Sequence, residues 1–308
     1  MCAGFRACTR FSCGEELLMR RRRISALTAF LLSLSFGVLL FSGWKLFEIL
    51  EGYIRAEREY ASLAEEFLIK RVPGAGEGNV GSKGPDVKEK DVDPVIEEDA
   101  NVVLLPGEGL DMRTERESEL VPAPIEVDWD GLIARNPDIV GWIYLEGFGN
   151  CSYPVMHADD NETYLHAGFD RDYLYAGCIF LDYENTGDFS DPSSIVYGHN
   201  MKDGSMFACL KKLKDQETYD AAPYFWILTP NGNYRYHIYS VFDTLPTGPV
   251  YSLWNRGGEN FADWERQIQS LSVVRNDVQL EESDHTVILS TCTPDHEHRT
   301  VVVGRRCI

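Results

Sequence analysis

Positive charge is scarce in this sequence beyond its first residues. The chain of 308 residues has 29 Lys and Arg against 49 Asp and Glu, a formal net charge of −20. Nucleic-acid binding depends on concentrated Lys and Arg that neutralise phosphates. Because no basic segment follows the N-terminus, the charge balance argues against a nucleic-acid partner.

The cysteine spacings of zinc sites and of disulfide-rich scaffolds are also missing. No Cys-x-x-Cys pair occurs among the eight cysteines. The five that follow the long apolar segment are Cys151, Cys178, Cys209, Cys292 and Cys307. Since five is an odd number, at least one of these thiols stays free unless it pairs between chains. Cys178 and Cys209 lie in apolar runs, so we expect them to be buried as small hydrophobic residues. We expect no metal and no cofactor.

Charge is absent from residues 24–44, a segment long enough to cross a hydrocarbon core as a helix. Four arginines at 20–23 precede it, and the positive-inside rule then predicts a cytoplasmic N-terminus at 1–23. The rest of the chain would be extracellular, held at the cell membrane by a single-pass anchor. The alternative is a cleaved signal peptide, but no obvious small-residue cleavage site follows the apolar run.

Three further segments follow the anchor. Residues 45–72 are predicted to be a helical stalk, because apolar residues recur at spacings of three and four. This stripe consists of Leu46, Ile49, Tyr53, Ala56, Tyr60, Leu63 and Phe67. It indicates either a short coiled coil or a helix that packs against an unspecified partner. Residues 73–124 are rich in Gly, Pro, Glu and Asp and are predicted to be an acidic flexible linker. The folded catalytic domain is predicted at 125–308.

Short strands dominate the pattern of the predicted domain. The segments 140–145, 194–197, 224–228, 234–239, 286–290 and 300–303 have β character. One amphipathic helix is predicted around 261–271, where Phe261, Trp264, Ile268 and Leu271 share a face. Many short strands with few helices predict a mostly β fold, either a barrel or a sandwich.

Three residues at strand ends have the chemistry of a thiol active site. Cys292 ends a predicted strand, which Pro294 terminates, so its thiol should lie near the surface. His199 follows another strand, where Gly198 provides backbone freedom. If the two strand ends are adjacent, an imidazolium can stabilise a thiolate. Arg299 opens the strand after Cys292, so a hairpin would place its guanidinium near the thiol to hold a carbonyl or an oxyanion.

Three segments together resemble a known family. They are Tyr-Gly-His-Asn at 197–200, Leu-Ser-Thr-Cys at 289–292 and Arg-Thr-Val-Val-Val-Gly at 299–304. In this order and separation they resemble the active-site motifs of Gram-positive sortases, over about residues 127–308, and class B sortases in particular. The resemblance implies an eight-stranded β-barrel with peripheral helices and a catalytic triad of His199, Cys292 and Arg299. It also implies four substrate-binding residues, Asn161, Leu165, Ser290 and Thr291.

The resemblance implies a cysteine transpeptidase. Cys292 would cleave the C-terminal sorting motif of secreted proteins through a thioester, and an amine of a peptidoglycan precursor or cross-bridge would resolve it. The same chemistry leaves two alternatives, a pilin-polymerising sortase and a thiol peptidase that releases its product by hydrolysis. A wall-binding adaptor on an inactive barrel would be expected to lack one of the three catalytic residues, and all three are present.

The turn at 295–298, Asp-His-Glu-His, has the composition of a loose metal site. Two histidines and two carboxylates on a short loop are also typical of a solvated turn, and we favour that interpretation.

Overall fold

The computed structural model describes residues 26–70, 121–252 and 261–307. The chain divides into two compact units, Met1–Leu50 and Glu51–Ile308, and helix α1 (Ala26–Phe67) contributes to both. The predicted cytoplasmic segment, 1–23, lies outside the described residues. So does the predicted acidic linker, except for residues 121–124.

The apolar half of α1 belongs to the first unit. Its large hydrophobic side chains are exposed, for example Leu27, Phe36 and Trp44. Within the described part of the chain, α1 is the one helix that is long and apolar enough to cross a membrane. Exposed apolar surface is unfavourable in water by about 25 cal/mol per Å². The helix therefore has the length and surface of the predicted anchor at 24–44.

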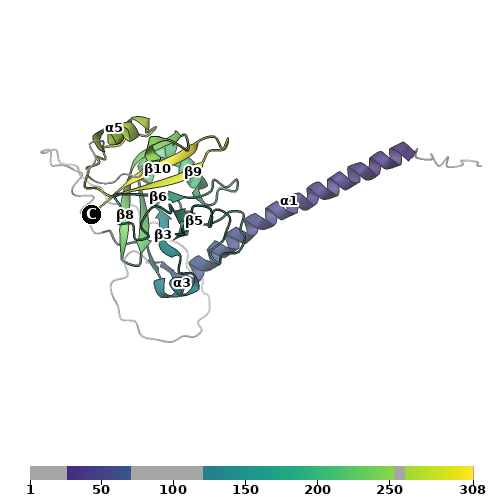
Figure 1. Ribbon diagram of the computed structural model, residues 1–308, viewed down its shortest axis with the longest axis horizontal. Coiled ribbons are helices and arrows are strands. Elements are labelled where there is room, and N and C mark those ends of the chain that lie inside the picture. Colours follow the sequence, from purple (N-terminus) through teal and green to yellow (C-terminus); the bar gives the residue numbers. More distant parts are fainter. Residues whose placement is uncertain (1–25, 71–120, 253–260, 308) are drawn as a thin grey trace, which may run out of the picture. The chain divides into compact units, whose positions relative to one another are not determined.

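The second unit contains a closed barrel of eight strands (Figure 1). The strands are β3 (Ile139–Leu145), β4 (Ser152–Met156), β5 (Ile179–Leu181), β6 (Ser193–Tyr197), β7 (Tyr224–Thr229), β8 (Gly232–Thr244), β9 (Thr286–Cys292) and β10 (Arg299–Arg306). They are arranged in the order β10-β8-β7-β3-β4-β5-β6-β9, with β9 pairing back to β10. Two of the pairs, β4 with β5 and β6 with β9, are parallel. The predicted mostly β, eight-stranded barrel is confirmed.

All six predicted strands are present, but β4 and β5 were not predicted from the pattern. β5 has only three residues, too few to show an alternation. β4 carries Pro154 in its middle, which normally argues against a central strand. Pro154 is tolerated because β5 pairs only with Val155 and Met156, beyond the position where the missing N–H would matter.

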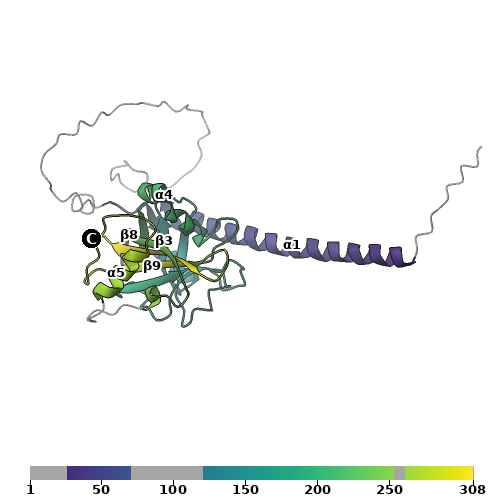
Figure 2. The ribbon, with the colours of Figure 1, turned by 90° about the horizontal axis from the view of Figure 1, so that it is seen from above.

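Helices and 3-10 turns cover parts of the barrel. They are α3 (Trp129–Arg135), η1 (Phe207–Lys214), α4 (Gln216–Ala221), η2 (Pro249–Tyr251) and α5 (Phe261–Leu271). The predicted amphipathic helix is α5, which lies on the outside of the barrel (Figure 2) and contacts β8, where Ser240 Oγ donates to the Ile268 carbonyl at 2.8 Å. Its Trp264 and Ile268 pack with Ile288 and Val301 in a second hydrophobic cluster, separate from the barrel interior.

The second half of α1 packs on the barrel unit. Its Ala56, Tyr60, Leu63 and Phe67 are buried in the main hydrophobic core, with Leu63 completely inaccessible. Directly after the helix, β1 (Leu68–Lys70) pairs with β2 (Ile125–Val127). From Tyr53 onward, the partner of the predicted stalk stripe is therefore this chain's own domain, whereas Leu46 and Ile49 are exposed. The compact unit begins at Glu51, before the boundary expected at residue 125.

Polar contacts join the same half of α1 to the long connection between β4 and β5. The Glu59 carboxylate accepts from the backbone N–H of Phe169 at 2.6 Å. The Tyr60 hydroxyl donates to the carbonyl of Gly177, and Arg55 forms an ion pair with Asp172. These contacts matter for function because this connection also carries Leu165, which reaches the candidate active site.

Candidate active site

Strand register brings the three candidate catalytic residues to one edge of the barrel. In the antiparallel β9–β10 hairpin, Arg299 is directly opposite Cys292. In the parallel β6–β9 pair, Tyr197 is opposite Ser290, so two residues further along each chain His199 comes level with Cys292. Since opposite residues in a ladder share a face, the thiol and the guanidinium lie on the same side of the sheet. The two strand ends are adjacent, which is the condition that a shared thiol–imidazole site requires.

Cys292 is the last residue of β9 and is partly exposed. Its carbonyl accepts from the Asn200 side-chain amide at 2.8 Å, which ties it to the segment that carries His199. Beyond it, the backbone N–H of Thr293 donates to the His298 carbonyl at 3.0 Å and closes the hairpin turn. The nucleophile candidate thus has a fixed backbone and an accessible thiol.

Gly198 lets the strand end pass close to the barrel core. A Cβ at this position would come within 2.4 Å of Ile179 and 2.7 Å of Phe207. Gly198 is not among the glycines with positive φ, so its role is close packing rather than the conformational freedom expected from the sequence. Behind it, the His199 carbonyl accepts from Phe207 N–H at 2.9 Å.

The imidazole of His199 is held by the β4–β5 connection. Its Nε2 lies 2.8 Å from the Leu165 carbonyl oxygen, and its ring stacks on His166 with centroids 5.3 Å apart and planes 17° apart. Because a carbonyl oxygen only accepts, Nε2 carries a proton and Nδ1 is left for proton transfer. Burial lowers the pKa of His199 below its usual value; the Leu165 contact opposes this shift, and the nearby His166 and His296 add to it.

Arg299 lies at the start of β10, partly buried. Its Nη1 donates to the carbonyl of His298 at 3.0 Å and to that of His296 at 3.4 Å. The guanidinium is therefore anchored to the turn that follows Cys292. An anchored planar fork of N–H donors is suited to a carbonyl or oxyanion in a fixed direction.

Tyr251 of η2 joins this group, although no feature of the sequence pointed to it. Its hydroxyl is 2.8 Å from Ser290 Oγ. Burial raises the pKa of Tyr251; the hydrogen bond with Ser290 and the charge of Arg299 oppose this shift, and Cys292 adds to it. The sequence could not identify it because η2 lies in the long connection between β8 and β9 and has no motif of its own.

The four predicted substrate-binding residues have different environments. Leu165 has an exposed side chain next to His199, and Ser290 is buried beneath Tyr251. Asn161 is linked to the site only indirectly: its amide donates to Asp182 at 3.0 Å, and Asp182 also accepts from the Tyr197 hydroxyl at 2.8 Å. All three nevertheless lie in segments that converge on the edge with Cys292.

Thr291 differs from these three. Strand alternation places it on the face opposite to Cys292, with Leu289, a residue of the main core. It is 3% exposed, and its hydroxyl has no hydrogen-bond partner within the described residues. Only the backbone of Thr291 is thus positioned to meet a peptide along this edge.

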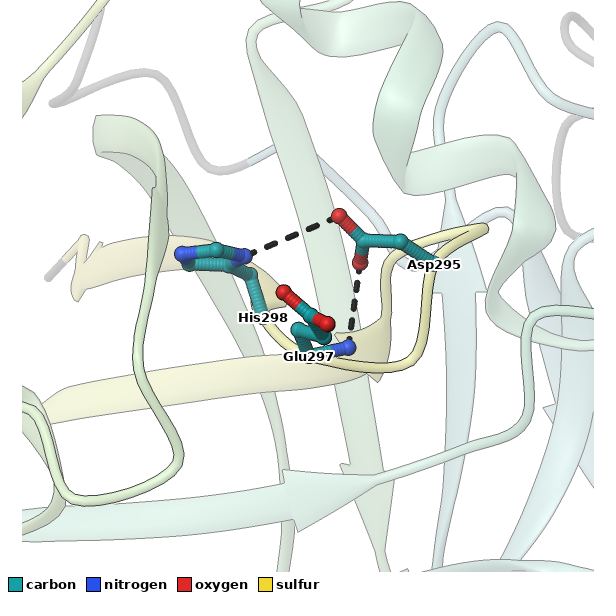
Figure 3. Close-up of side chains that lie close together, drawn as sticks. All are labelled: Asp295, Glu297 and His298. Carbon is teal, nitrogen blue, oxygen red and sulfur yellow. Dashed lines mark hydrogen bonds and ion pairs between the residues drawn. The ribbon is translucent and has the colours of Figure 1, made fainter.

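The turn at 295–298 gathers Asp295, Glu297 and His298, with ligand atoms within 4.8 Å of one another (Figure 3). The Asp295 carboxylate accepts from Thr293 Oγ1 and from the Glu297 N–H, at 3.0 Å for the latter, and these bonds hold the pKa of Asp295 below its usual value. His298 Nδ1 lies 3.7 Å from Asp295 Oδ2. Formation of the turn accounts for these contacts, and the solvated-turn interpretation stays a prediction.

A family model described as the sortase domain matches residues 143–307, more than half of the chain. The chain belongs to the sortase family. Sortase B of Listeria monocytogenes is 35% identical over 175 residues, which cover 55% of this chain and 70% of that protein. Sortase B of Staphylococcus aureus is 27% identical over 184 residues, 59% of this chain and 75% of that protein.

Solved sortases share the fold. The Staphylococcus aureus sortase B–substrate complex has a TM-score of 0.55 and 27% identity, and covers 63% of this chain and 89% of that one. The sortase B of Listeria monocytogenes has a TM-score of 0.52 and 34% identity, with coverage of 57% and 98%. The resemblance to class B sortases is confirmed. Sortases are cysteine transpeptidases, and this chain is one of them.

Besides Tyr251, the sequence analysis missed Asn200 and His166 as site residues. Asn200 belongs to the motif at 197–200, so its neighbour His199 was a usable signal. His166 had no signal, because nothing in the sequence indicates that the residue after Leu165 stacks on a histidine 33 positions later.

Proposed function

We propose that this sortase cleaves a C-terminal sorting motif of secreted proteins and joins the product to a peptidoglycan amine. Cys292 attacks the carbonyl carbon at the scissile bond and forms a thioester. His199 Nδ1 takes the proton of the Cys292 thiol and passes it to the departing amine, and Arg299 stabilises the oxyanion. The amine of a peptidoglycan precursor or cross-bridge then attacks the thioester; its proton goes to His199 and returns to the Cys292 sulfur as the C–S bond breaks.

The register of β6, β9 and β10 is the observation that carries this proposal. A nucleophile, a proton carrier and an anchored cation lie at one sheet edge, on strands paired with each other. Each role matches the chemistry of its side chain: the partly exposed thiol is accessible, the imidazole has Nδ1 available, and the guanidinium keeps N–H donors in a planar fork.

The residues that surround this edge of the barrel support a peptide as the substrate. Leu165, whose carbonyl contacts His199, has an exposed apolar side chain, and the Tyr251 hydroxyl lies 2.8 Å from Ser290 Oγ, two residues before Cys292. The Staphylococcus aureus relative has been solved as a substrate complex, and we extend a peptide substrate to this chain by analogy. Asn161, Leu165, Ser290 and the backbone of Thr291 are our candidates for substrate contacts.

The membrane anchor completes the proposal. We propose that residues 24–44, which include the first half of α1, cross the membrane with residues 1–23 in the cytoplasm and the barrel outside the cell. Secreted proteins and lipid-linked wall precursors both reach the outer membrane face, so anchoring there raises the effective concentration of both substrates. The uncharged, exposed apolar half of α1 supports this placement.

The function is tested by trapping the thioester. The protein is incubated with a library of peptides that carry candidate sorting motifs, and Cys292 is examined by mass spectrometry for an acyl adduct. A motif-dependent adduct is expected, and its mass gives the cleaved sequence. The Cys292→Ala variant is the control. No adduct with any peptide, while the protein remains folded, would refute the proposed function.

The fate of the thioester separates the alternatives. Added peptidoglycan-type amines should yield a ligated product, whereas a pilin polymerase would accept a lysine side chain of another protein. Release of free acid alone, at a rate unchanged by any amine, would identify a thiol peptidase.

A further inference from the structure

Two buried cysteines from distant parts of the chain meet in the barrel unit. Cys151 precedes β4, Cys209 lies in η1, and their Sγ atoms are 2.8 Å apart although the residues are 58 positions apart. Cys151 is 0% and Cys209 2% exposed, and both belong to the main hydrophobic core. Neither takes part in the active-site contacts described above.

The backbone around the two thiols is fixed by hydrogen bonds. Cys151 donates to the Phe148 carbonyl at 2.8 Å and accepts from Leu145 N–H at 3.0 Å, which closes the turn between β3 and β4. Both sulfur atoms lie 3.7 Å from the carbonyl of Met206, whose own N–H donates to the Tyr153 hydroxyl at 2.9 Å. The two side chains therefore face each other because their main chains are held, not through a flexible surface contact.

We propose that Cys151 and Cys209 are a disulfide-forming pair that is oxidised while the barrel folds outside the membrane. This oxidation rests on the extracellular placement under Proposed function, where disulfides persist. In the reaction, one thiolate attacks the disulfide of an oxidant and releases one thiol. The second thiolate then attacks the mixed disulfide and releases the other. Two protein thiols lose two electrons and two protons, and the oxidant disulfide is reduced to two thiols.

Burial determines when this step occurs. In the closed fold, desolvation raises the pKa of Cys151 strongly, and the thiolate needed for exchange is scarce. Oxidation must therefore precede closure of the core, and afterwards the bond is shielded from reductants. Cys178, also buried, contacts the Tyr60 hydroxyl at 3.5 Å rather than a second thiol. Cys292 keeps the partly exposed thiol that catalysis needs.

The bond would brace the active-site side of the barrel. η1 begins at Phe207, whose N–H donates to the His199 carbonyl, so Cys209 lies in the element that supports the histidine segment. The disulfide would connect η1 covalently to the turn between β3 and β4. It restricts the unfolded chain by closing a loop of about sixty residues, which stabilises the folded state.

The pair is tested by mapping thiols in the full chain. The protein is isolated from cells with its membrane and, in a second arm, refolded in detergent with oxidised and reduced glutathione. Free thiols are blocked with N-ethylmaleimide in denaturant, disulfides are reduced, and new thiols are labelled with iodoacetamide. We expect iodoacetamide on Cys151 and Cys209 and N-ethylmaleimide on Cys178 and Cys292. N-ethylmaleimide on both Cys151 and Cys209 after oxidative refolding would overturn the proposal.

The two arms separate this inference from the proposed placement. A linked pair after refolding but not in cells would support the pair and refute the extracellular position of the barrel. Thioester formation at Cys292 is measured on the same samples. A linked pair without any thioester would count against the proposed function and not against the disulfide.

A stability measurement provides the second readout. Protein refolded with reductant should melt roughly 5–15 °C below protein refolded with oxidant. The double variant Cys151→Ala, Cys209→Ala should show no such difference and should still form the thioester. Cys178→Ala is the matched control, a buried thiol whose removal should leave the difference intact. An unchanged melting temperature in the wild type would contradict a stabilising disulfide.

Discussion

At the scale of single residues, the guanidinium of Arg299, which lies opposite Cys292, has two candidate roles. A charge provider only needs a positive group near the thiolate, whereas an oxyanion holder needs N–H donors in a fixed direction. The bonds of Nη1 to the turn carbonyls orient the guanidinium and favour the second role.

Arg299→Lys is therefore expected to lose about a hundredfold or more in kcat, the scale of one lost oxyanion donor, because an ammonium cannot reproduce the planar fork. Its melting temperature should stay close to that of the wild type, since the side chain is partly exposed at the start of β10. Steady-state kinetics with a cleavable peptide measure the effect. Near-normal turnover in Arg299→Lys would reduce the residue to a charge provider, and in Arg299→Ala would remove it from the site.

The contrast between Cys292 and Cys178 tests which thiol reacts. Cys292→Ala should abolish the thioester and leave the melting temperature nearly unchanged, because its side chain is partly exposed. Cys178→Ala should keep the thioester and cost about 1 kcal/mol or more of unfolding free energy, since the site is completely buried. Mass spectrometry and denaturant titration give the two readouts. Transpeptidation by Cys292→Ala would invalidate the mechanism.

His199 should titrate below the usual value of about 6.5 for histidine, because burial disfavours the charged ring. Its folded pKa is depressed, so its contribution to stability is complete above the unfolded value of about 6.5 and is lost as the pH falls from there through the lower folded pKa. An NMR titration of the His199 ring measures this pKa. His166→Phe should raise it, because the variant keeps a stacked ring and removes a nearby charge. A midpoint at or above 6.5 in the wild type would contradict the expected shift.

At the scale of elements, the two halves of α1 differ in their surroundings. Its first half is apolar and exposed, and its second half carries the stripe that fills part of the barrel core. Glu59 and Tyr60 also hold the connection that carries Leu165. The second half of α1 is thus a structural part of the barrel unit.

Leu63→Ala should reduce the free energy of unfolding by about 2–5 kcal/mol, because Leu63 is completely buried. Ile54→Ala is the matched control on the same helix, where the side chain is 46% exposed, and its effect should stay within about 0.5 kcal/mol. Chemical denaturation of both variants measures the difference. Equal, small effects would mean that the helix is a spacer and that the domain begins near residue 125.

At the scale of the whole molecule, the orientation of the proposed anchor at 24–44 would determine on which side of the membrane the barrel meets its substrates. The four arginines at 20–23 precede the apolar segment, and no comparable cluster follows it. Lys and Arg are enriched in the cytoplasmic segments that flank a membrane span, so this cluster predicts a cytoplasmic N-terminus.

Protease added to cells that have been stripped of wall under osmotic support should therefore digest the C-terminal domain, as detected with an antibody to that domain. A cytoplasmic protein serves as the control for intact cells. Protection of the domain until detergent is added would reverse the proposed topology.

The sequence by itself determined the features that depend on local pattern. Short runs of β-branched and apolar residues identified the strands next to Cys292, His199 and Arg299, and the uncharged segment at 24–44 identified the helix that could cross a membrane. The motifs at strand ends were sufficient to identify the family, because each motif is a short contiguous segment that can be recognised without knowing the fold.

The tertiary structure alone decided which distant segments meet. The Leu165 carbonyl reaches His199, Tyr251 covers Ser290, and Cys151 faces Cys209. The helical stripe of α1 showed that one face is buried but not against what, since periodicity carries no information about a partner. These contacts depend on how the barrel closes, which places side chains together through strand order rather than through proximity along the chain.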